Sequence, residues 1–141
     1  MTRLLISVII SCISFQSDAL TLEVITDQPG QIAQVARLRK NGINVHIYDL
    51  NAGKRIEQEL AQGLTGPDQH ARQQLKQHIA AIGRKQFETR LQDAFRALIQ
   101  SVAYQLDRYP AVVFNQGEAV VYGVTDLTTA LGYYQRWKAG Q

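Results

Sequence analysis

Cysteine is nearly absent from this sequence of 141 residues, and the single one, Cys12, lies close to the N-terminus. The chain beyond Cys12 can therefore form no disulfide, carry out no thiol–disulfide exchange and offer no thiolate to a metal. The excess of positive over negative charge is also small, since the formal net charge is only +3. An excess this small does not by itself indicate nucleic acid or an anionic membrane as a partner.

The first 19 residues have the parts of a secretory signal peptide. Arg3 gives a short basic opening, an apolar run extends from Leu4 to Ile10, and small residues lead to a predicted cleavage point after Ala19. The run is too short to span a bilayer, which disfavours a retained anchor. A second interpretation stays open, because residues 9–12, IISC, loosely fit a lipoprotein signal with Cys12 as the lipidated residue. Either interpretation predicts export of one domain, residues 20–141, without a transmembrane segment.

The first half of this domain has a β-α-β pattern. Residues 20–26 are typical of a strand, and Thr26-Asp27-Gln28-Pro29 predicts a capped helix start with proline in the first turn. This helix should continue to about Lys40, where Asn41-Gly42 stops it. Residues 43–48 then alternate apolar and polar side chains, as an edge strand would.

Helical spacing dominates the middle of the chain. One helix is predicted from Leu50 to Leu64, and a second has its apolar stripe between Ala71 and Ile82. After a break near Gly83, a longer helix carries apolar residues on one side: Phe87, Leu91, Phe95, Leu98, Val102 and Leu106. These helices connect the two halves of the domain.

Residues 108–131, RYPAVVFNQGEAVVYGVTDLTTAL, predict a β-β-α unit at the centre of the domain. The strands are Ala111–Phe114 and Ala119–Val124, joined by a turn at residues 115–118, and Thr125 or Asp126 opens the last helix. Both apolar runs are nearly continuous, so we expect helices to cover both faces of both strands. Right-handed crossover of the first unit places this hairpin beside the first strand.

This order of elements is the plan of a thioredoxin-like α/β domain, with a mixed four-stranded sheet flanked by helices. In that fold the strand after the helical connection begins with a cis-proline, and Tyr109-Pro110 stands at this place. The order of elements favours the cis isomer, and a trans proline opening a strand is the alternative. The thioredoxin active-site position, residues 26–31, reads TDQPGQ and has no CxxC. We therefore expect the fold without its redox function.

Several blocks of the sequence resemble a family of integrating conjugative element proteins, over essentially the whole predicted domain. That family is similar in plan to the exported, thioredoxin-like pilus-assembly proteins of F-type conjugation systems. The resemblance implies a non-catalytic periplasmic component of a conjugative type IV secretion system, which acts in assembly or scaffolding by contacting other periplasmic or envelope subunits. It implies no catalytic residue, and we expect no cofactor and no small-molecule substrate. The matching blocks are residues 47–50 (IYDL), 59–64 (ELAQGL), 67–68 (PD), 108–114 (RYPAVVF) and 119–126 (AVVYGVTD).

Aromatic residues gather in the last third of the chain and supply candidates for partner binding. Tyr133, Tyr134 and Trp137 occupy adjacent faces of the last predicted helix, so not all of them can be buried at once. An aromatic surface formed by them beside Tyr109 and Pro110 would suit a protein partner or a peptide edge. Packing within the core is the other interpretation.

The remaining polar motifs favour structural roles. His70 and His78 lie eight residues apart on one predicted helix and are better explained as solvent-facing residues than as a metal pair. The cations at residues 37–40 fall in a last helical turn, where orphan carbonyls favour them. The basic residues of the central helices lack interleaved aromatics, so direct contact with nucleic acid is not expected.

An enzyme is the alternative function, with a non-thiol site near Asp27, Gln31 and Pro110 at the thioredoxin active-site position. No nucleophile–base pair stands out there, which favours the non-catalytic hypothesis.

Overall fold

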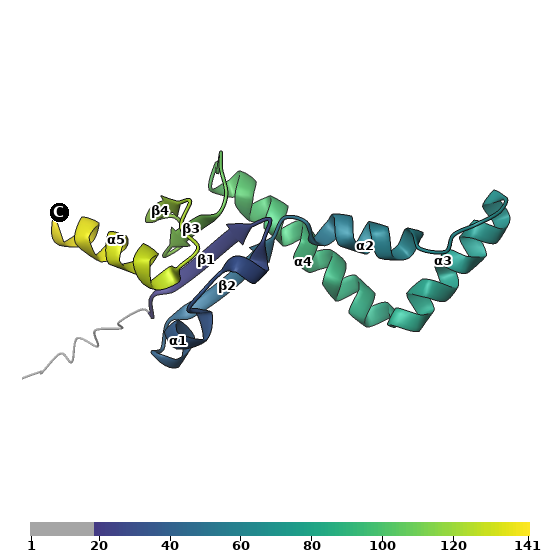
Figure 1. Cartoon of the computed structure of the whole chain (residues 1–141), viewed down its shortest axis with the longest axis horizontal. Coiled ribbons are helices and arrows are strands. Elements are labelled where there is room, and N and C mark those ends of the chain that lie inside the picture. The colour runs from purple at the N-terminus through teal and green to yellow at the C-terminus, as the bar shows by residue number, and fades with distance from the viewer. Residues whose placement is uncertain (1–18) are drawn as a thin grey trace, which may run out of the picture.

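The computed structural model describes residues 19–141 and shows a sheet from which a long helical arm projects (Figure 1). The predicted signal peptide lies outside the described residues, apart from Ala19. Four strands form the sheet in the order β2-β1-β3-β4, and only β1 and β2 run parallel. The predicted α/β fold is confirmed, with a mixed four-stranded sheet in the thioredoxin-like layout. The strands are β1 (Thr21–Thr26), β2 (Asn44–Asp49), β3 (Ala111–Phe114) and β4 (Ala119–Tyr122).

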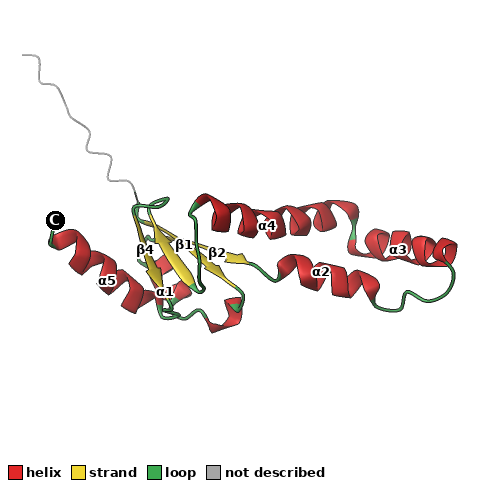
Figure 2. Ribbon diagram, turned by 90° about the horizontal axis from the view of Figure 1, so that it is seen from above, coloured by secondary structure: helices red, strands yellow, loops and turns green. Residues whose placement is uncertain are grey.

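Helices cover the two faces of the sheet unequally. One face carries the short α1 and the C-terminal α5, while α4 packs on the other through contacts with β1 and β2. Beyond the sheet, α4 continues beside α2 and meets α3 at the far end of the arm (Figure 2). The helices are η1 (Pro29–Gln31), α1 (Val35–Lys40), α2 (Ala52–Ala61), α3 (Asp68–Ile82), α4 (Arg84–Ala103) and α5 (Leu127–Ala139).

The main core lies between the sheet and the pair α1 and α5. Leu22, Val24, Val112 and Phe114 alternate along β1 and β3 on this face, and none of them is exposed. Leu127 of α5 closes the cluster from the helix side. Successive side chains of a strand point to opposite faces of the sheet. A continuous apolar run therefore supplies the buried side chains of both faces of the central strands.

The predicted helix from Pro29 to Lys40 is wrong in its extent. Ala33 donates its N–H to Thr125 O (2.9 Å) and accepts from Leu127 N (3.3 Å), so the main chain pairs with a distant segment. Gln34 then adopts a left-handed conformation with φ of 69°, and a regular helix begins only at Val35. The predicted helix is therefore divided into the short η1, Pro29–Gln31, and α1, with the long-range bridge at Ala33 between them.

The expectation that both hairpin strands are covered on both faces is also wrong for one of them. All four residues of β3 are buried, whereas every residue of β4 is only partly buried. The reason is the strand order, because β4 forms the edge of the sheet and has a neighbour on one side only.

Several local predictions are confirmed. The Tyr109–Pro110 bond is cis, Gly83 separates α3 from α4 with φ of 89°, and Asp126 caps α5 by accepting from Thr129 N at 2.9 Å. Among the described residues, no helix is both long enough and apolar enough to cross a membrane.

Candidate functional site

The three aromatic residues of α5 divide between the core and the surface. Tyr134 is only 5% exposed and stacks on Phe114, with ring centroids 4.4 Å apart. Tyr133 and Trp137 are 48% and 43% exposed. The crowding predicted from their positions on one helix is therefore relieved by burying Tyr134 and leaving the other two outside.

A groove runs between β4 and α5 at this surface. Its volume is about 350 Å³. Tyr133 and Trp137 border it from the helix, and Val120 and Val121 border it from the strand. The groove therefore lies along β4, the edge strand of the sheet.

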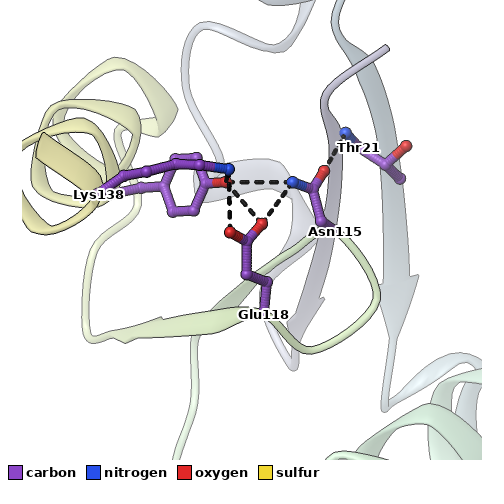
Figure 3. A network of polar contacts seen from close by, with 5 residues as sticks. Thr21, Asn115, Glu118 and Lys138 are labelled. Atoms are coloured by element: carbon purple, nitrogen blue, oxygen red, sulfur yellow. Dashed lines mark hydrogen bonds and ion pairs between the residues drawn. The ribbon is translucent and has the colours of Figure 1, made fainter. Parts of the chain in front are cut away.

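A polar network fixes the relation of α5 to the hairpin (Figure 3). Glu118 accepts hydrogen bonds from Asn115 Nδ2 (2.6 Å), Tyr134 Oη (2.7 Å) and Lys138 Nζ (3.0 Å). Asn115 in turn accepts from Thr21 N (3.2 Å). These bonds, from Asn115 first and then from Tyr134 and Lys138, lower the pKa of Glu118 to about 2. The network ties β1, the turn and α5 together and thereby positions the aromatic groove.

Tyr109 and Pro110 lie elsewhere, at the opposite end of β3 from the hairpin turn. Tyr109 is 38% exposed, and its hydroxyl is hydrogen-bonded to the Ser101 hydroxyl of α4. The predicted aromatic surface that joins Tyr109 to Tyr133 and Trp137 is thus not formed. Strand β4 returns the chain to the Pro110 end of the sheet, and α5 then runs back toward the turn, where Tyr134 contacts Glu118. A role of any of these residues in binding stays a prediction.

An exposed apolar surface on the arm was not identified from the sequence. Five apolar residues on one side of α4 are more than one-third exposed: Leu91 (36%), Phe95 (56%), Leu98 (52%), Ile99 (62%) and Val102 (76%). We call these five residues the α4 row. Near its N-terminal end, Phe87 and Ile79 border an open groove of about 460 Å³ between α3 and α4. The sequence predicted most of this stripe, but not that it lacks a covering element.

The other unexpected feature is a buried carboxylate. Glu23, in the middle of β1, is only 6% exposed, and its side chain accepts from Tyr48 Oη (3.1 Å) and Gln100 Nε2 (3.4 Å). The hydroxyl of Tyr104 donates to its second oxygen. The sequence signal for such a site is a lone charged residue inside an apolar strand, TLEVIT.

The surroundings of Glu23 change the pKa values of two neighbouring tyrosine hydroxyls. Burial first, and then the Glu23 carboxylate, raise the pKa values of Tyr48 and Tyr104 above their ordinary value. Both hydroxyls therefore stay protonated and donate to Glu23, which links β1 to β2 and to Tyr104, the residue that follows α4. The cluster borders an open pocket of about 570 Å³ that also includes His46.

This pocket is not the alternative active site predicted from the sequence. Asp27 and Gln31 are exposed, and neither they nor Pro110 border the Glu23 pocket. His78 contacts Leu60 O through Nδ1 at 3.4 Å. Within residues 19–141, no three His, Cys, Asp or Glu side chains are placed to hold a metal ion together.

Comparison with known proteins adds one finding. The model of a protein family, described as Protein of unknown function (DUF1525), matches residues 21–140. No match was found among curated proteins or among solved structures.

Proposed function

This chain belongs to the family described as Protein of unknown function (DUF1525), and we propose that it is a non-catalytic component of a conjugative type IV secretion system. In this proposal the protein is exported to the periplasm and serves in assembly, as a scaffold that holds other envelope subunits of the apparatus. The proposal of a conjugative secretion system comes from the resemblance of residues 108–126 and other blocks to integrating conjugative element proteins. The surface of the arm supplies the reason to expect protein partners.

The observation that carries the proposal is the exposure of the α4 row. Its members recur at intervals of four, three, one and three residues, so they lie on one side of about three helical turns. Soluble proteins rarely leave a contiguous apolar row of this kind in water, because burying apolar surface is favourable by about 25 cal/mol per Å². The same spacing lets a helix pack along an apolar helix of another protein. An amphipathic helix of another subunit is therefore the expected partner.

The polar clusters support a structural role over catalysis. Glu23 and Glu118 are each held by several hydrogen bonds that connect separate elements of the fold. Carboxylates used in this way hold separate elements together, which is a structural role.

The experiment is affinity purification of the tagged protein, after crosslinking, from cells in which the integrating conjugative element is induced. We compare the natural protein with Phe95→Asp, which places a charge in the α4 row, and with Thr89→Asp, which places the same charge on an exposed part of α4 outside the row. We expect envelope secretion subunits to copurify with the natural protein and with Thr89→Asp but not with Phe95→Asp. The frequency of DNA transfer should fall in Phe95→Asp and stay unchanged in Thr89→Asp.

Two outcomes would contradict the proposal. Recovery of the same subunits with Phe95→Asp would show that the α4 row is not the contact surface. Recovery of the protein only with copies of itself, lost in Phe95→Asp, would assign the row to self-association and remove the reason to expect a scaffold for other subunits.

A further inference from the structure

The two edges of the sheet differ in how they are protected. At the β2 edge, Asn44 donates its N–H to Leu20 O (2.9 Å), so Asn44 turns toward β1 and Val45 turns its main-chain groups outward. Arg39 covers that position, because its Nη2 and Nε donate to Val45 O at 2.7 and 3.2 Å. A guanidinium on an outward carbonyl is a device that hinders pairing with another strand.

The β4 edge has no such cover. Gly123 donates to Pro110 O (2.8 Å), which marks a hydrogen-bonded pair of the β3–β4 ladder. The alternation of an antiparallel ladder then turns the N–H and C=O groups of Val120 and Tyr122 away from β3. In residues 19–141, no side chain and no main-chain group outside the ladder bonds to these outward groups. The strand, AVVY, also lacks the lysine and proline that blunt edge strands.

The groove between β4 and α5 runs beside these open main-chain groups. Val120 borders the groove with Tyr133 and Trp137, both nearly half exposed. A chain in extended conformation could bond to β4 through its main chain and place alternate side chains against the aromatic wall of α5. Edge and groove together therefore provide both parts of a strand-addition site.

Cations frame this site. The guanidinium of Arg108 lies 5.1 Å from the centre of the Tyr122 ring, and that of Arg136 lies 5.0 Å from the centre of the Tyr133 ring. Arg108 is paired with Asp107, whereas Arg136 has no carboxylate within ion-pair distance among the described residues. Glu118 also borders the groove, but Lys138 pairs with it at 3.0 Å. The charge of Arg136 is therefore the one left to a partner, and the complementary charge is negative.

We propose that β4 and the adjoining groove bind an extended segment of a partner protein, with acidic and apolar side chains in alternation, as a fifth strand of the sheet. A second copy of this chain is a poorer occupant, because its own β4 would bring the same cations to the contact. The proposal rests on the proposed function for the expectation of a protein partner. It uses a surface on the opposite side of the molecule from the tip of the arm (Figure 1).

The test exploits the outward direction of the Val120 N–H. Val120→Pro removes this donor and leaves the ladder bonds to β3 in place, while Val120→Ile keeps the donor and serves as the matched control. The probe is a phage library of random peptides of about 12 residues, a length that spans the edge with margin. The library is selected on the purified protein, and enriched peptides are titrated while the fluorescence of Trp137, the one tryptophan of the chain, is followed.

We expect enriched peptides that alternate apolar residues with Asp or Glu. Their affinity should fall about tenfold or more in Val120→Pro, through the loss of a main-chain hydrogen bond and its neighbours, and should stay unchanged in Val120→Ile. Arg136→Glu should weaken binding as well. If circular dichroism shows that Val120→Pro is unfolded, the binding of Arg136→Glu decides whether the peptides bind at this site.

Three results would overturn the proposal: no enrichment of any peptide, equal binding to Val120→Ile, Val120→Pro and Arg136→Glu, or a dimer of the free protein that Val120→Pro dissociates. Phe95→Asp should bind the peptides like the natural protein. The peptide assay and the copurification experiment can therefore fail separately.

Discussion

The sheet with α1 and α5, which we call the sheet body, and the arm of α2, α3 and α4 treat apolar residues in opposite ways. In the sheet body, Leu22, Phe114 and Leu127 are fully buried. In the arm, Phe95 and Val102 are more than half exposed, and α3 has no buried residue. The sheet body buries most of its apolar residues and leaves Tyr133 and Trp137 of α5 partly exposed, whereas the arm leaves one whole apolar side of α4 exposed. Nothing within residues 19–141 covers this stripe, and under the proposed function a partner protein would cover it.

The arm is held by smaller contacts. Ala94 and Ala97 of α4 and Ile56 of α2 are its buried apolar residues, and Arg90 of α4 forms an ion pair with Glu59 of α2. An exposed ion pair contributes little to stability. The arm therefore depends mainly on the contacts of these few buried apolar side chains.

The largest expected effect separates two phenylalanines. Phe114→Ala in the sheet body should lower the free energy of unfolding by about 3–5 kcal/mol, because the cavity lies in a fully packed core. Phe95→Ala in the arm, where the ring is 56% exposed, should change it by no more than about 0.5 kcal/mol. Urea denaturation followed by circular dichroism measures both. Equal losses would mean that the α4 row is part of the core.

The next comparison concerns two carboxylates. Glu23→Ala should lower the free energy of unfolding by about 2–3 kcal/mol, because the donors from Tyr48, Tyr104 and Gln100 lose their acceptor. Glu59→Ala in the arm should leave it nearly unchanged. The same denaturation experiment applies. A small effect of Glu23→Ala would show that water replaces the carboxylate in the open pocket beside it.

Helix capping gives a smaller difference between the two regions. Asp126 caps α5, whereas α2, α3 and α4 have no side-chain cap. Asp126→Ala should therefore lower the free energy of unfolding by about 1 kcal/mol. Asp126→Asn should lower it much less, because asparagine is also a good N-cap residue. Hydrogen exchange of the α5 amides reports the change locally, and unaltered exchange would contradict a role for the cap.

The smallest effect is a pH dependence of the contact between α5 and the hairpin. Folding lowers the pKa of Glu118 from its ordinary value of 4.5 to about 2. Its contribution to stability is therefore complete above about pH 4.5 and is lost as the pH falls toward 2. Trp137 fluorescence should change in this window in the natural protein and not in Glu118→Gln. An identical titration in both proteins would assign the change to other groups.

Much of the fold could be predicted from local patterns. The strands, the break at Gly83, the hairpin and the cap at Asp126 each depend on residues within a few positions of one another, where periodicity and turn chemistry are decisive. The first helix was predicted too long, because the bridge between Ala33 and residues 125–127 joins segments about 90 positions apart. No local pattern contains that information.

The site shows the same division. The sequence by itself determined which side chains share a helix face, so it gave the crowding of Tyr133, Tyr134 and Trp137 and most of the α4 row. Only the tertiary structure decided that Tyr134 is the buried member, that Tyr109 lies apart from the others, and that nothing within residues 19–141 covers Phe95 and Val102. The physical reason is that periodicity assigns residues to a face, whereas burial depends on which distant element packs against that face.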